Sequence, residues 1–95
     1  MTIINIFDYF FSIPTETERR MIQELDWVIL TSNIPEYSLE EGDIGTVVLV
    51  HQGGKGYEVE FVTLDGETVA IVSLHSIQVR PVGRREIARS RLINL

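Results

Sequence analysis

Residues 57–61 alternate between apolar and acidic side chains, and this alternation constrains the fold more than any other feature of the chain. A period of two places the tyrosine, valine and phenylalanine on one side of an extended strand, with Glu58 and Glu60 on the other. The pair Asp65-Gly66 then separates this strand from a second β-rich segment, which is a strong hairpin signal. The chain therefore requires a sheet with one dry face and one wet face.

Similar patterns predict five short strands, at about residues 26–31, 44–51, 57–63, 67–74 and 77–80. They are joined in turn by a long irregular loop, a glycine-rich loop, the Asp-Gly turn and a brief kink at His75-Ser76. This succession predicts a mainly β protein built as a small SH3-like five-stranded barrel, because closure removes exposed strand edges. An oligonucleotide-binding barrel is the alternative, although its strands are usually longer. The unbroken apolar run 47–50 predicts a strand covered on both sides.

The chain divides into three zones: an apolar arm with a short helix at 1–24, the barrel at 25–83, and a basic tail at 84–95 that forms either a short helix or an extended segment. Thr15 and Glu18 have the spacing of a capping box, which predicts a helix from about residue 16 to 24. The arm carries an acid and stops at a proline, short of the roughly 20 residues that a membrane span needs. It is expected to belong to a soluble protein.

The 95 residues suffice for one domain with a single modest core. With no cysteine, the sequence excludes a disulfide scaffold and a cysteine-based zinc site, and it favours a cytoplasmic location. The net charge of −6 is uneven: residues 25–83 carry nine acids against two basic residues, a net of −7, whereas residues 84–95 carry four arginines and one glutamate, a net of +3. The body is acidic and the tail is basic.

No residue set in the sequence indicates catalysis. The glycine loop 53–56 departs from the P-loop pattern, because a strand follows its lysine where a phosphate site needs a helix. His51 and His75 lack metal-like spacing, and Glu58 and Glu60 form a solvated pair with no burial to raise a pKa. The serines that flank His75 lack the geometry of an activated nucleophile. We therefore expect no enzyme activity, no cofactor and no metal.

Large apolar side chains and acidic side chains instead indicate a protein interface. The arm has more apolar residues than a small barrel can cover, and Trp27 is either a core residue or an interface anchor. The acids of the barrel would complement a basic partner. The predicted partner-binding residues are Phe7, Phe10, Phe11, Trp27, Asp43, Glu58 and Glu60.

Two resemblances bear on function. The stretch 39–51 resembles the KOW element of ribosomal and transcription proteins, yet the net charge of the barrel disfavours nucleic acid as a partner. The four patterns LDWVILT, LEEGDIGTVV, KGYEVEF and QVRPV, spread over residues 25–82, resemble a family of small bacterial and cyanobacterial proteins catalogued as a domain of unknown function. That resemblance implies an SH3-like module without known catalysis, often encoded beside a toxin-like or larger partner.

The leading hypothesis is a cytoplasmic, non-enzymatic module that binds and neutralises a basic protein partner, as an antitoxin or immunity protein does. One alternative is a nucleic-acid-binding regulator that uses the arginines of the tail 84–95. Another is an accessory subunit or homo-oligomer assembled through the arm.

Overall fold

The protein forms five antiparallel strands, seen in a computed structural model that describes residues 22–94. Each strand falls within one or two residues of its predicted place, so all five strand predictions are confirmed. Two short 3-10 turns interrupt the connections. The elements are β1 (Trp27–Leu30), η1 (Pro35–Tyr37), β2 (Ile44–His51), β3 (Gly56–Val62), β4 (Thr68–His75), η2 (Ser76–Gln78) and β5 (Val79–Pro81).

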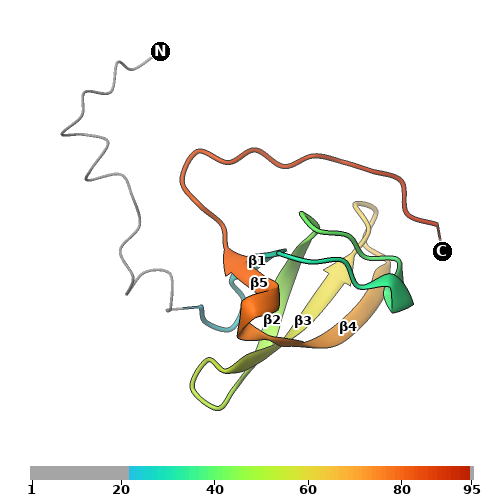
Figure 1. Cartoon of the computed structure of the whole chain (residues 1–95). Coiled ribbons are helices and arrows are strands. Elements are labelled where there is room, and N and C mark those ends of the chain that lie inside the picture. Colours follow the sequence, from blue (N-terminus) through green and yellow to red (C-terminus); the bar gives the residue numbers. More distant parts are fainter. Residues whose placement is uncertain (1–21, 95) are drawn as a thin grey trace, which may run out of the picture.

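The strands form one curved, open sheet in the order β4-β3-β2-β1-β5 (Figure 1). β4 and β5 are its two edges and do not pair with each other, so the prediction of a closed barrel is wrong. The reason is the length of β5, whose three residues are all paired with β1. So short a strand cannot also extend a second ladder along the eight residues of β4.

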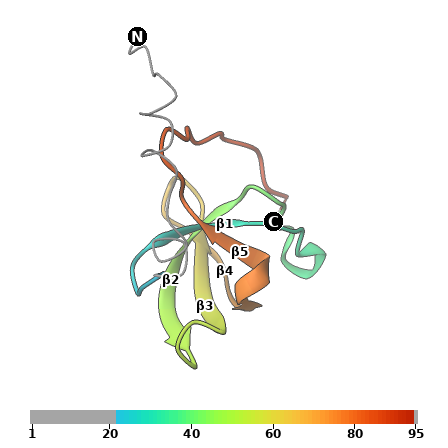
Figure 2. The same cartoon turned by 60° about the vertical axis from the view of Figure 1, so that its left-hand side comes forward.

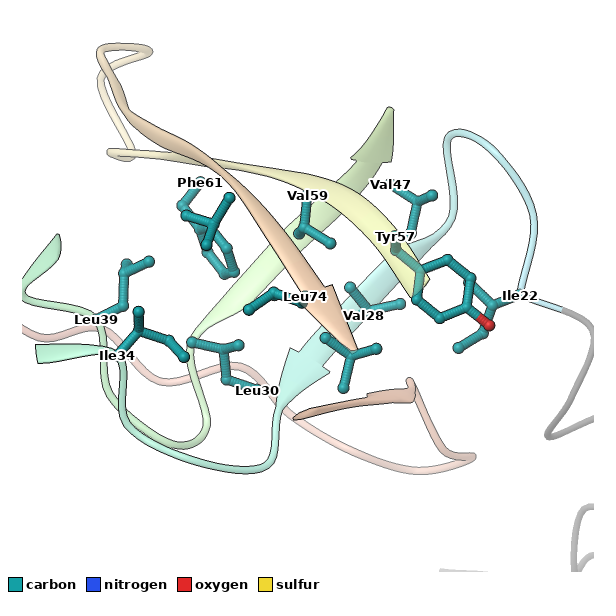
Figure 3. Close-up of a cluster of buried hydrophobic side chains, with 12 residues drawn as sticks. Ile22, Val28, Leu30, Ile34, Leu39, Val47, Tyr57, Val59, Phe61 and Leu74 are labelled. Atoms are coloured by element: carbon teal, nitrogen blue, oxygen red, sulfur yellow. The ribbon is translucent and has the colours of Figure 1, made fainter. Parts of the chain in front are cut away.

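The concave side of the sheet carries the core, as the alternation in β3 predicts. Tyr57, Val59 and Phe61 are at most 3% exposed, whereas their acidic neighbours lie on the other side. Figure 3 shows Ile34 and Leu39 at one end of this cluster. Tyr57 and Ile22 lie at the other end. The fully buried side chains are Val28, Leu30, Val47 and Val59.

Gly45 lets β2 lie closely against β3. A Cβ atom at this position would come within 2.5 Å of Val59 Cγ1 and 2.8 Å of Phe61 Cε1. Such distances are well inside van der Waals contact, so a larger residue would force core side chains or the strand itself to move. Within the KOW-like stretch, the close packing of two strands therefore explains the glycine at position 45.

A β-bulge explains the apolar run 47–50 in β2. The register between β2 and β3 shifts between Val47 and Leu49. As a result, the consecutive residues Val48 and Leu49 both fall on the outer side of the sheet. Val47 is completely buried, but Val48 is 38% exposed and Leu49 is 44% exposed. The prediction of a strand covered on both faces is therefore wrong, because the bulge and not a second layer breaks the alternation.

Most of the predicted N-terminal arm and helix, residues 1–24, lies outside the described residues. The part that is described, 22–24, is not helical, and the chain turns at Glu24 and Leu25, where φ is +73° at Leu25. Ile22 is 8% exposed and joins the core, whereas Leu25 is 79% exposed. Within residues 22–94, no helix has the length and apolar character required to cross a bilayer.

The tail after β5 contains no helix over residues 84–94. It runs across the molecule and ends near the loop that carries η1 (Figures 1 and 2). Two arginine–carboxylate contacts tie it down, Arg80 with Glu86 and Arg91 with Asp43. A helix advances about 1.5 Å per residue and an extended chain about 3.3 Å, so a helical tail would cover much less of this path. Of the two predicted forms, the extended one is observed.

Candidate functional site

A row of four side chains crosses the convex face of the sheet. Trp27 of β1 pairs with Thr46 of β2, which pairs with Glu60 of β3, which in turn pairs with Ile71 of β4. Residues directly opposite one another in an antiparallel sheet point to the same side, so the four side chains lie in line. Trp27 is 65% exposed and Ile71 is 55% exposed. Of the two predictions for Trp27, the one that places it in the core is therefore wrong.

A second row lies beside the first, where Leu49 of β2 pairs with Glu58 of β3 and Glu58 pairs with Ser73 of β4. The half-exposed leucine adds apolar area next to the acids. We use the name outer face for the seven residues of the two rows, which combine apolar, hydroxyl and acidic groups, namely Trp27, Thr46, Leu49, Glu58, Glu60, Ile71 and Ser73.

Neighbouring side chains fix both carboxylates of the outer face. Ser73 Oγ donates to the two oxygens of Glu58 at 2.7 and 2.6 Å, and His51 Nε2 lies 2.6 Å from Glu58 Oε2. The bond from Ser73, followed by that from His51, lowers the pKa of Glu58. Thr68 Oγ1 donates to Glu60 at 3.0 Å. Two predicted partner-binding acids thus stand side by side on β3, with their orientation set by other side chains.

The grouping of His51, Glu58 and Ser73 was missed by sequence analysis. Its signal was the glycine hairpin 52–55, which brings the end of β2 back over the start of β3, so His51 pairs with Gly56 and lies diagonally from Glu58. In this group the hydroxyl of Ser73 donates to the carboxylate of Glu58, and His51 contacts the same carboxylate. The described residues 22–94 also contain no cluster of three or more side chains suited to a metal ion.

The remaining predicted partner-binding residues do not lie on the outer face. Asp43 is at the end of the β1–β2 loop, where Arg91 donates from Nε to Oδ1 at 2.8 Å and from Nη2 to Oδ2 at 2.5 Å. Partial burial acts to raise the pKa of Asp43, but the bonds from Arg91 and from the Glu40 N–H outweigh it and lower the pKa. Phe7, Phe10 and Phe11 lie outside the described residues.

The nucleic-acid alternative depends on the four arginines of the tail, and one of them, Arg91, is already paired with Asp43. Arg84, Arg85 and Arg89 are exposed and form no ion pair with another residue of the range 22–94. Three arginines beside a strongly acidic sheet make a small electrostatic footprint for a polyanion.

Comparison with known protein families assigns the central part of the chain. The model of a family described as a domain of unknown function, DUF4926, matches residues 24–81. The matched range begins just before β1 and ends with the last residue of β5. Comparison with curated proteins and with solved structures gave no match.

Proposed function

Because the chain belongs to the DUF4926 family, a domain of unknown function, we propose from its surfaces that it is a non-enzymatic protein-binding module. The outer face binds a basic protein partner, and the chain neutralises that partner as an antitoxin or immunity protein does. The binding takes place in the cytoplasm, which agrees with the absence of cysteine from the sequence.

The observation that supports this proposal is the row from Trp27 to Ile71. Large side chains exposed at both ends of one row provide anchors of the kind that dominate interface energies, and tryptophan is enriched among such anchors. Glu60, inside the row, and the neighbouring Glu58 would select a partner that presents arginine or lysine at matching positions. Scattered apolar residues are ordinary on protein surfaces, but here they are aligned with oriented carboxylates.

The fold supports an SH3-like assignment within this proposal. A long first loop, a glycine hairpin, a tight turn and a 3-10 turn before a short last strand occur in the order expected for that class. The row from Trp27 to Ile71 is not needed for the core, since the buried cluster lies on the opposite side of the sheet. It is therefore available for binding without a cost in stability.

The first experiment compares capture of a partner from extracts of the source organism by three full-length proteins. The face variant combines Trp27→Ser with Glu60→Gln. The control combines Tyr37→Ser with Glu36→Gln, which likewise removes one exposed aromatic side chain and one negative charge, but from η1. We expect the wild type and the control to retain one dominant basic protein that the face variant loses. Equal retention by all three proteins, or none above an empty resin, would refute the outer face as the binding site.

The second experiment separates neutralisation from simple binding. The captured partner is expressed in a host cell alone, with the wild type, and with the face variant. An antitoxin or immunity role predicts slowed growth with the partner alone, recovery with the wild type and no recovery with the face variant. A partner that is harmless by itself would show that the chain is an accessory subunit and not a neutralising protein.

A further inference from the structure

The β1–β2 loop holds the guanidinium group of Arg91 from three directions. Asp43 accepts two hydrogen bonds from it, the carbonyl of Ser38 accepts a third from Nη2 at 2.9 Å, and Glu40 Oε2 lies 3.4 Å from Nη1. A side-on pair with a carboxylate is the geometry that favours arginine over lysine. The loop thus presents acceptors arranged to fit the planar group of an arginine.

The carboxylate of Asp43 is positioned without help from the tail. Asp43 Oδ2 accepts the Glu40 N–H at 2.8 Å, and the backbone of Asp43 is tied to β1 because Leu30 N–H donates to its carbonyl at 2.9 Å. Ile34 and Leu39, which bridge to each other across the base of the loop, are buried in the core. All of these contacts lie within residues 30–43, so none of them depends on Arg91.

The tail itself is held by few contacts between its two ion pairs. Ile87 is 91% exposed and Leu92 is 97% exposed, while Ile93 packs against the core only in part. Ion pairs at the protein surface contribute little net stability. A segment that offers an arginine and outcompetes the tethered tail can therefore take its place.

We propose that Ser38, Glu40 and Asp43 form an arginine-binding site, filled by Arg91 in the free protein and by an arginine of an extended segment of the basic protein partner in the complex. This inference rests on the proposed function, since it names a second contact of the same partner. Asp43 lies three residues before Thr46 of the outer face, or about 10 Å along an extended chain. One partner can thus reach both sites.

Charge favours this occupant. Residues 25–83 carry a net charge of −7, so a basic segment gains from the whole surface as well as from the site. The chain's own tail, the basic part of the sequence, demonstrates the kind of segment that fits. Because the tail is tethered, it competes at a high effective concentration, and the site has to bind a partner arginine against this competition.

The test uses a fluorescent peptide with the sequence of residues 84–95 and full-length proteins, so it does not need the partner. Fluorescence anisotropy measures the Kd for the wild type and for Arg91→Ala. The Arg91→Ala protein should bind the peptide at least about fivefold more tightly than the wild type does, because the tethered competitor is removed. A second peptide carries lysine in place of its last arginine, which corresponds to Arg91. It should bind the Arg91→Ala protein at least about tenfold more weakly than the original peptide does, because lysine cannot form the side-on pair.

Two further proteins locate the binding. Asp43→Asn added to Arg91→Ala should weaken peptide binding at least about tenfold, because a charge-assisted hydrogen bond is replaced by a neutral one. Glu41→Gln added to Arg91→Ala removes the same charge two positions away in the same loop, from a carboxylate that accepts no hydrogen bond from the range 22–94, and it should change the Kd less than about twofold.

Equal binding by the wild type and Arg91→Ala, or equal binding of the arginine and lysine peptides, would overturn the proposal. The peptide comparison uses one folded protein, so it stays decisive even if Asp43→Asn unfolds the chain. Failure of this test with successful partner capture would reject only the arginine site. Success here with no captured partner would reject the proposed function and leave the site as a means of holding the tail.

Discussion

At the scale of single residues, the side of the strand on which a residue falls decides its role more than its type does. Leu30 is 1% exposed, while Leu64, in the β3–β4 turn, is 96% exposed. Trp27 is exposed because its neighbour Val28 takes the inward position of β1. Composition alone counts these residues as equally hydrophobic, although only the inward ones contribute to stability.

Leu30→Ala should lower the free energy of unfolding by about 2–5 kcal/mol, because it leaves a cavity in the centre of the core. Leu64→Ala makes the same chemical change in solvent and should alter it by less than about 0.5 kcal/mol. Urea unfolding followed by circular dichroism measures both values. Similar losses in the two variants would contradict the assignment of the core.

At the scale of elements, a turn and an ion pair set the path of the tail. Glu86 accepts the Gly83 N–H at 2.5 Å and receives two bonds from Arg80, at 2.8 and 2.7 Å. The bonds from Arg80, followed by that from the Gly83 N–H, lower the pKa of Glu86 from 4.5 to about 2. The carboxylate form is thus the one that holds the start of the tail.

The turn should respond to acid between the two pKa values of Glu86. Since the folded pKa is the lower one, its stabilising contribution is complete above about pH 4.5 and is lost as the pH falls through about 2. The thermal midpoint of the wild type should therefore exceed that of Glu86→Gln at pH 6, and the difference should vanish near pH 2. Carboxyl-carbon NMR of Glu86 gives the titration directly. A midpoint near 4.5 would contradict the observed contacts.

At the scale of the whole molecule, the open sheet leaves β4 as an exposed edge. Within residues 22–94 it pairs only with β3, and its sequence TVAIVSLH contains no lysine, proline or acid that would discourage pairing with another chain. The net charge of −6 supplies general repulsion between molecules at neutral pH. Near the pI of about 4.7 this protection disappears.

We expect the protein to associate near pH 4.7, and Ile71→Lys to suppress this association by placing a charge in the middle of the β4 edge. Light scattering as a function of pH measures the effect. Leu64→Lys is the matched control, because it adds the same charge on an exposed leucine away from the edge. Equal suppression by both variants would show that net charge, not the strand edge, limits association.

Much of the sheet could be predicted because strand signals are local. The alternation in residues 57–61 and the Asp65-Gly66 turn define β3, its dry face and the following hairpin without reference to the rest of the chain. The bulge in β2 could not be predicted, because it depends on how Val47 and Leu49 meet β3. The outer-face acids were predicted as a solvated pair, but both are half-buried, and their roles in binding stay predictions.

The sequence by itself determined the five strands, the acidic body and the basic tail, since hydrophobic period and charge are properties of neighbouring residues. Only the tertiary structure decided that the sheet stays open, that Trp27 and Ile71 share one row, and that Arg91 reaches Asp43, 48 residues away in the chain. The physical reason is that register, strand length and long-range ion pairing depend on distances between segments, which no local pattern encodes.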